Sequence, residues 1–164
     1  MKIYLAGPDV FRPDALAWAE QARALLQRHG HHALIPLDNT ETTAAGIYRA
    51  NIALIAEADA VIANLNPFRG CEPDSGTAFE VGYAIASKKT VIGYLDDDRP
   101  QIEKLAGSVD AQGMSIENFG LPINLMLGIP CRIVRGSLAD ALALLVETAV
   151  SSNSSELPAS RQSA

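Results

Sequence analysis

The sequence lacks the usual features of membrane proteins, secreted proteins and metal-binding proteins. Among 164 residues there are only two cysteines, Cys71 and Cys131, and they have no CxxC spacing. This argues against a disulfide framework or a metal site and for two free thiols. No apolar run approaches the roughly 18 residues of a membrane-spanning helix, and the first residues do not resemble a cleavable signal. These absences predict a cytoplasmic protein with no membrane partner.

Basic residues are also scarce. The chain has 13 Lys and Arg against 19 Asp and Glu, which gives a formal net charge of −6, and the basic residues form no cluster. A protein that binds nucleic acid needs grouped positive charge to neutralise phosphates. We therefore expect no nucleic-acid partner.

Several common catalytic signatures are missing too. The turn AGPDVF after the first apolar run lacks the GxxxxGK[ST] pattern of a phosphate-binding loop, and no GxGxxG dinucleotide fingerprint is present. No Ser or Cys is accompanied by a plausible His base. The sequence thus disfavours P-loop NTPases, NAD enzymes and Ser or Cys hydrolases, and we expect neither a metal nor a cofactor.

What the chain does contain is a regular alternation of short apolar runs and segments with helical periodicity. The expected strands are 2–6, 32–37, 59–65, 90–95 and 131–135, and the expected helices are 14–28, 39–58, 76–86, 121–127 and 137–150. Strands that are apolar on both faces belong in a parallel sheet covered by helices on both sides. The predicted fold is α/β, a flavodoxin-like doubly wound sheet of about five parallel strands, formed as one domain by residues 1–150. The Ser-rich residues 151–164 are expected to form a flexible polar tail.

In doubly wound sheets, ligands bind beyond the carboxyl ends of the strands, where the strand order reverses. Three loops follow strand ends in this chain, at 6–11, 36–40 and 66–76, and should share one rim of the sheet. Within the first two loops we expect Gly7, Phe11 and Asp38 to contact a substrate.

The third loop leads into a helix that carries one carboxylate, Glu80, among apolar side chains. A helix that is apolar all round is buried, in the core or against another subunit. A buried carboxylate is costly unless it is paired or used, and burial raises its pKa. A structural ion pair with Arg69 or Arg49 would account for Glu80, and so would catalysis.

A second carboxylate, Asp74, lies six residues before Glu80. It can serve as the helix N-cap or as the partner of Glu80 in an acid and nucleophile pair. Two carboxylates on either side of an anomeric carbon suit glycosidic chemistry, because one attacks C1′ while the other handles the proton of the leaving group. Tyr4, in the first strand, could hold one of them through its hydroxyl.

Four segments together make the sequence resemble the nucleoside 2-deoxyribosyltransferase family. They are IYLAGPDVF, IPLDN, DSGTAFEVGYA and LPINLML, in that order between residues 3 and 127. The resemblance implies transfer of a 2-deoxyribosyl group between purine or pyrimidine bases, with retention at C1′. The substrates would be a 2′-deoxynucleoside and a free nucleobase.

The resemblance also implies roles for individual residues. Glu80 would be the nucleophile that forms the glycosyl-enzyme intermediate, Asp74 would move the proton of the base, and Tyr4 would orient Glu80. Asn51 aligns with a residue that contacts the base. Asn124 would reach the sugar 5′-hydroxyl in the site of a neighbouring subunit, so the resemblance implies a dimer or a larger homo-oligomer.

Two alternatives stay open. The chain could be a 2′-deoxynucleoside 5′-monophosphate N-glycosidase, in which water replaces the acceptor base and Arg69 is the only obvious cation on the catalytic loop. It could also be a nucleotide-binding module without catalysis, in which Glu80 is structural. Asn51 and Thr40 differ from the residues of some family members, so the base preference is open as well.

Overall fold

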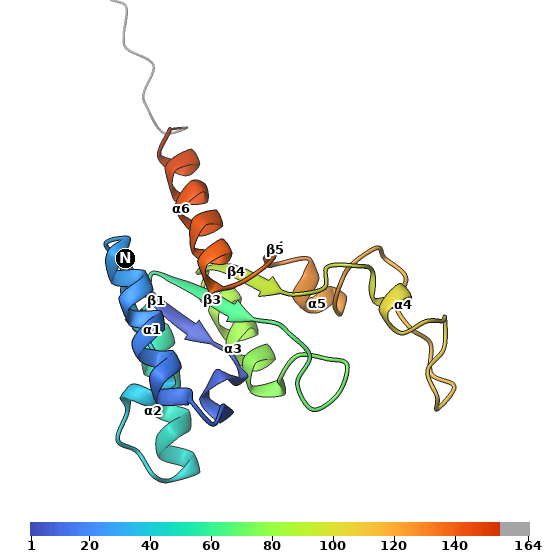
Figure 1. Cartoon of the computed structure of the whole chain (residues 1–164), viewed down its shortest axis with the longest axis horizontal. Helices are drawn as coiled ribbons and strands as arrows, with labels where there is room; N and C mark the ends of the chain where they lie inside the picture. The colour runs from blue at the N-terminus through green and yellow to red at the C-terminus, as the bar shows by residue number, and fades with distance from the viewer. Residues whose placement is uncertain (155–164) are drawn as a thin grey trace, which may run out of the picture.

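The computed structural model describes residues 1–154 and contains one five-stranded, wholly parallel sheet (Figure 1). The strand order is β2-β1-β3-β4-β5, which is that of flavodoxin-like doubly wound folds and confirms the predicted fold. The strands are β1 (Lys2–Ala6), β2 (His32–Leu34), β3 (Ala60–Asn64), β4 (Thr90–Leu95) and β5 (Arg132–Arg135).

Both faces of the sheet are buried, as the apolar strands predict. In β1, Ile3 and Leu5 belong to one core cluster while Tyr4 and Ala6 belong to the other. This alternation follows from the two-residue period of a strand. The fold thus has two cores, one on each side of the sheet.

Helices cover each face of the sheet (Figure 1). The core cluster on one side contains residues of α1 and α6, and the cluster on the other side contains residues of α2, α3 and α5. The helices are α1 (Ala15–Arg28), α2 (Ala44–Glu57), α3 (Ser75–Ala86), α4 (Gln101–Lys104), α5 (Leu125–Gly128) and α6 (Leu138–Ser154), with short 3-10 turns η1 (Pro8–Phe11) and η2 (Pro36–Asp38).

Four elements differ from their expected bounds by more than one residue. The helix expected at 121–127 is shortened to α5, which begins at Leu125 because the Asn124 side chain caps it by accepting from the Met126 N–H. The second strand ends at Leu34, because Pro36 cannot donate to a ladder and begins η2 instead. Helix α2 starts at Ala44 and not at 39, because the Thr43 side chain accepts a hydrogen bond from the Gly46 N–H and caps it. Helix α6 continues to Ser154, so the first four residues of the expected tail are helical, and 155–164 lie outside the described residues.

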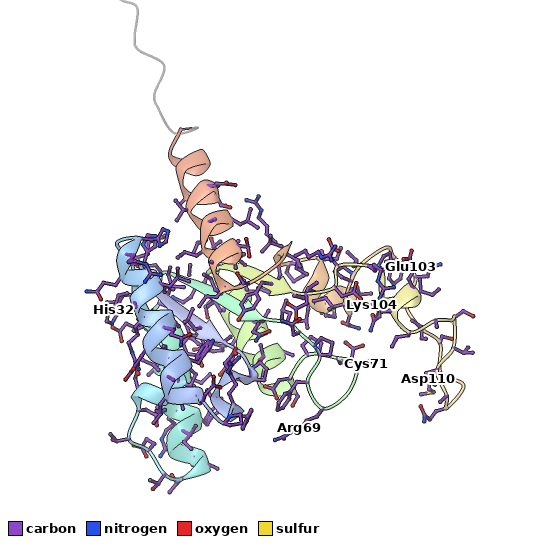
Figure 2. All side chains as sticks on the ribbon, in the orientation of Figure 1. His32, Arg69, Cys71, Glu103, Lys104 and Asp110 are labelled. Carbon is purple, nitrogen blue, oxygen red and sulfur yellow. The ribbon has the colours of Figure 1, made fainter. Side chains whose placement is uncertain are left out.

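The connection from β4 to β5 contains a long Asp- and Gly-rich segment. It holds α4 and a small bridge between Val109 and Ser115, and it projects from the body of the molecule, with Asp110 toward its far end (Figure 2). Within the described chain no helix combines the length and the apolar character needed to cross a bilayer.

The strand order reverses between β1 and β3. From β1 the chain goes outward through α1 to β2 and then returns across β1 through α2 to β3. The loops that leave the carboxyl ends of β1 and β3 therefore face each other at the switch point. This is the place where the sequence predicts a ligand.

Candidate active site

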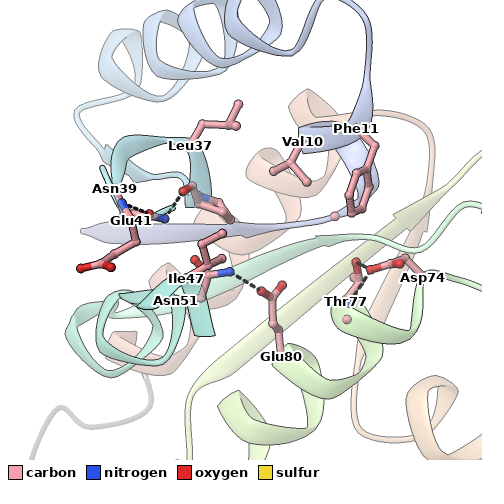
Figure 3. Close-up of a pocket in the computed structure, with 13 residues that line it drawn as sticks. Val10, Phe11, Leu37, Asn39, Glu41, Ile47, Asn51, Asp74, Thr77 and Glu80 are labelled. Atoms are coloured by element: carbon pink, nitrogen blue, oxygen red, sulfur yellow. Dashed lines mark hydrogen bonds between the residues drawn. The ribbon is translucent and has the colours of Figure 1, made fainter. Parts of the chain in front are cut away.

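A cavity of about 390 Å³ lies at this switch point (Figure 3). Its walls come from the loop after β1, the segment after β2, helix α2 and the start of α3. The lining residues are Gly7, Val10, Phe11, Pro36, Leu37, Asn39, Glu41, Ile47, Asn51, Asp74, Gly76, Thr77 and Glu80. Five of the eight residues expected in the site, Gly7, Phe11, Asn51, Asp74 and Glu80, are among them.

Glu80 is held by two hydrogen bonds from separate elements. The hydroxyl of Tyr4, in the middle of β1, donates to Glu80 Oε1 at 2.7 Å. The amide Nδ2 of Asn51, on α2, donates to the same oxygen at 3.3 Å, as Figure 3 shows. Since Tyr4 is 0% exposed, one end of the carboxylate is anchored to the core of the sheet.

The surroundings of Glu80 shift its protonation toward neutral pH. Burial raises the pKa of Glu80 to about 7, the hydrogen bonds from Tyr4 and Asn51 oppose this, and the negative charge of Asp74 adds to the rise. The pKa of Tyr4 is also raised, by burial first and then by the charge of Glu80, so Tyr4 remains a hydrogen-bond donor. A carboxyl with a pKa near the operating pH is suited to catalysis.

Asp74 caps α3 and lines the cavity at the same time. Its Oδ2 accepts hydrogen bonds from the Thr77 backbone N–H at 2.9 Å and from Thr77 Oγ1 at 3.1 Å. The two interpretations of Asp74 left open by the sequence are therefore compatible. The cap fixes the side chain, and its carboxylate faces the same cavity as Glu80 (Figure 3).

The sequence model of the family described as "Nucleoside 2-deoxyribosyltransferase" matches residues 3–126, well over half of the chain. The chain belongs to this family. The matched range contains every site residue predicted from the sequence, from Tyr4 to Asn124.

Solved structures agree with membership of the deoxyribosyltransferase family. A 2-desoxiribosyltransferase from Leishmania mexicana is 46% identical with a TM-score of 0.83, over 89% of this chain and 97% of that one. A 2-deoxyribosyltransferase from Bacillus psychrosaccharolyticus (20% identity, TM-score 0.56, 86% of this chain and 96% of that chain) shares the fold. A CMP N-glycosidase from Clostridium botulinum also shares the fold (18% identity, TM-score 0.50, 89% of this chain and 99% of that chain).

One curated relative, an uncharacterized protein of Schizosaccharomyces pombe, is 32% identical over 113 residues, or 63% of this chain. The alignment spans 54% of that relative. The chain therefore spans about half the length of the curated relative that it matches.

Neither arginine considered as an ion-pair partner of Glu80 fills that role. The guanidinium of Arg69 lies 5.2 Å from the ring centroid of Phe11 and 4.6 Å from that of Phe68, and Arg69 lies on the loop that precedes α3 (Figure 2). No ion pair found within residues 1–154 includes Glu80 or Arg49. The partly buried carboxylate of Glu80 is thus stabilised by neutral donors, not by a cation.

Two expected substrate contacts lie outside this cavity. Asp38 pairs with Arg23, and its Oδ2 accepts a hydrogen bond from the Ile35 N–H at 3.3 Å. Asn124 caps α5 through the Met126 N–H and donates to Glu117 Oε1 at 2.7 Å, beside a different cavity. Neither side chain contacts the Glu80 cavity of its own chain.

Several lining residues were not predicted from the sequence. Asn39 and Glu41 follow β2, and Asn39 is fixed by donating to the Pro36 carbonyl at 2.5 Å while it accepts from the Glu41 N–H at 3.0 Å. Ile47 comes from α2. The position of Asn39 next to a strand end was a signal for its place on the rim, whereas nothing in the sequence distinguished Ile47 from a core residue.

No group of three or more His, Cys, Asp or Glu side chains within residues 1–154 is arranged to hold a metal ion. The polar groups at the cavity are three carboxylates, Glu41, Asp74 and Glu80, and the amides of Asn39 and Asn51, with the phenol of Tyr4 bonded to Glu80 from behind.

Proposed function

We propose that the protein transfers a 2-deoxyribosyl group between nucleobases through a covalent intermediate on Glu80, with retention at C1′. The observation that carries the proposal is the Glu80 carboxylate at the cavity wall, anchored by Tyr4 and Asn51 through a single oxygen. Its other oxygen is left to act as a nucleophile. Membership of the family supports the same reaction.

The reaction divides into two displacements. Glu80 and Asp74 share one proton, and the reactive form has it on Asp74 with Glu80 ionised. Glu80 attacks C1′, the bond from C1′ to the base nitrogen breaks, and Asp74 gives its proton to the departing base. A second base then attacks C1′ from the face that the first base left, and the bond to Glu80 breaks while Asp74 takes up the proton. Two inversions give net retention, and the order of events predicts ping-pong kinetics.

A carboxylate is a sufficient nucleophile for this substrate. A 2-deoxy sugar has no electron-withdrawing 2′-hydroxyl, so positive charge develops at C1′ with less difficulty than in a ribonucleoside. Tyr4 and Asn51 hold Glu80 in one orientation, which reduces the entropy lost on reaching the transition state. Neither step needs a metal or a redox cofactor.

The lining of the cavity suits a nucleobase. Val10, Phe11, Leu37 and Ile47 supply apolar walls, and Asn39, Glu41 and Asn51 supply polar groups. A volume of about 390 Å³ lies within the range of small-molecule sites. The proposed substrates are accordingly a 2′-deoxynucleoside and a free nucleobase.

We also propose that the site is completed in a homo-oligomer. Helix α3 buries Thr77, Val81 and Ala84 in its own chain, while Phe79 on its other side is 50% exposed. The ring centroids of Tyr48 and Phe79 lie 6.1 Å apart, and Tyr48 is 57% exposed. An exposed aromatic patch of this kind is typical of an interface, and a second copy seated there would bring its Asn124 toward the neighbouring cavity.

The test is an assay with a purine 2′-deoxynucleoside, with and without a different free purine base, followed by chromatography. We expect a new deoxynucleoside only when the acceptor base is present. Release of free base at the same rate without acceptor, above all from a 5′-monophosphate, would identify an N-glycosidase that uses Arg69 for the phosphate. No turnover in any reaction would identify a binding module.

A further inference from the structure

A buried carboxylate that the proposed reaction does not use lies behind the cavity wall. Asp9, in η1, is 6% exposed, and its nearest cation, Arg12 Nη1, is 3.8 Å from Oδ1. Arg12 itself is engaged at shorter distances by Asp14, at 2.9 and 3.0 Å. Burying a carboxylate that is not tightly paired with a cation is costly, so Asp9 needs another close partner.

The close partner of Asp9 is an amide at the end of a neighbouring strand. Asn64 Nδ2, in the last residue of β3, donates to Asp9 Oδ2 at 2.9 Å. Asn64 Oδ1 in turn accepts from both the backbone N–H and Nδ2 of Asn66, at 3.2 and 2.9 Å. The Asp96 N–H donates to Asn66 Oδ1 at 2.8 Å. One chain of hydrogen bonds thus crosses the carboxyl ends of β1, β3 and β4.

The space around this chain is tightly filled. A Cβ added to Gly7 would lie 2.8 Å from Asp9 Oδ2 and 2.9 Å from Asn64 Cβ, which is closer than carbon atoms tolerate. Gly7 is therefore required by the contact between Asp9 and Asn64 as well as by the cavity that it lines.

The two loops joined by Asp9 and Asn64 also meet through aromatic rings. Phe11, two residues after Asp9, stacks on Phe68 with ring centroids 5.4 Å apart and an angle of 18°, and Arg69 covers both rings. Phe11 lines the cavity although it is 56% exposed. An exposed side chain at the edge of a site keeps its position only if its loop is fixed.

We infer that Asp9 is a positioning residue for the substrate: through Asn64 its carboxylate locks the β1–α1 loop to the β3–α3 loop and so sets the place of Phe11 on the cavity wall. The inference rests on the proposed function for its kinetic readout. The predicted effect on substrate binding does not depend on the proposed function, because a residue of the cavity wall affects affinity whether or not transfer follows.

A swap of the two partners tests the contact. Asn64→Asp places two carboxylates against each other in a buried site, and we expect kcat/KM for a purine 2′-deoxynucleoside to fall at least about tenfold. In the double variant Asp9→Asn with Asn64→Asp the donor and the acceptor exchange places, and kcat/KM should return to within about threefold of the wild type. Failure of the double variant to recover, in a folded protein, would overturn the inference.

A second pair of variants asks whether Asp9 acts through Phe11. Asp9→Ala should raise KM about tenfold and change kcat less than threefold, since the wall contacts the base in both the ground and the transition state. In a Phe11→Ala background the same Asp9→Ala change should cost less than threefold. An equal loss in both backgrounds would assign Asp9 a merely structural role and refute the proposal.

The control is Asp14→Ala, which removes a carboxylate from the same loop and the same arginine but from an exposed position, and should leave kcat/KM unchanged. If the wild type transfers nothing, the proposed function fails, and the Kd of the deoxynucleoside measured by calorimetry replaces KM. The positioning role then stands if Asn64→Asp weakens binding tenfold and the swap restores it, and it falls if binding is unchanged.

Discussion

The hydroxyl of Tyr4 donates a 2.7 Å hydrogen bond to Glu80 across 76 residues of sequence. Because this hydrogen bond favours the ionised carboxylate, it opposes the effect of burial, and the balance leaves the pKa of Glu80 at about 7. The proposed nucleophile is thus poised at neutral pH by two opposing effects that can be separated by mutation.

Replacing Tyr4 by Phe should slow transfer and move its pH dependence. Wild-type activity is expected to rise with pH through about 7 as Glu80 ionises. Without the hydroxyl, the pKa of Glu80 rises further, so this limb of the profile moves to higher pH. A hydrogen bond to a charged group contributes about 1.5–3 kcal/mol, so kcat/KM at pH 6 should fall roughly tenfold or more, with partial recovery at pH 9. A uniform loss at every pH would contradict the assigned role of Tyr4.

Glu80→Gln should abolish transfer yet stabilise the protein at neutral pH. The folded-state pKa of about 7 exceeds the ordinary value of 4.5, so the folded protein binds the proton more tightly than the unfolded chain does. Wild-type stability is then fully present below pH 4.5 and declines as the pH rises through 7. The difference in unfolding free energy between variant and wild type should grow from near zero at pH 4 to about 3 kcal/mol above pH 7. Urea titrations at both pH values measure it, and a pH-independent difference would refute the prediction.

Asp74 can be tested so that capping and chemistry separate. Asp74→Ser keeps a good helix cap but removes the carboxylate, so Tm should stay close to the wild type while kcat falls about 100-fold. Asp74→Ala should lose the same activity and in addition about 1 kcal/mol of stability. Retention of full activity in Asp74→Ser would mean that capping is the whole role of Asp74.

The exposed aromatic patch on α2 and α3 predicts the assembly. Phe79→Glu places a charge at the proposed interface, and sedimentation should then show a smaller species with reduced activity. Leu16→Glu is the matched control, because Leu16 is 73% exposed on α1, on the other face of the sheet. A wild type that sediments as an active monomer, or a Phe79→Glu variant of unchanged mass, would exclude this interface.

Much of the fold could be predicted from the sequence because the three central strands, β1, β3 and β4, are buried on both faces. Runs such as 2–6 and 59–65 have no polar face to give them a second interpretation. The predicted second strand, 32–37, is too long, because the Ile35 N–H donates to the Asp38 side chain and not to a neighbouring strand. Apolar content alone does not reveal such a local competitor.

The site was predictable to the extent that its residues follow strand ends or interrupt an apolar helix. Asp74 and Glu80 fulfil these conditions and line one cavity. The partner of Glu80 was less accessible to sequence reasoning. Without the resemblance, an arginine was the natural candidate, whereas Asn51 was placed beside Glu80 by the packing of α2 on α3. The contact between Asp9 and Asn64 was not predicted either. Side-chain contacts between loops depend on the register of the strands that carry them, and the sequence does not give that register.

Because Glu80 is anchored to a wholly buried tyrosine, its position does not depend on the loops that line the rest of the cavity. Tyr4 and Glu80 belong to a strand and a helix of the core, while Phe11, Asn39 and Glu41 belong to connecting segments. Grafting those segments from a relative should therefore exchange base preference and leave the nucleophile as it is. The fold is in this sense modular: β1 and α3 of the core determine the reactivity, and the connecting segments determine which base is bound.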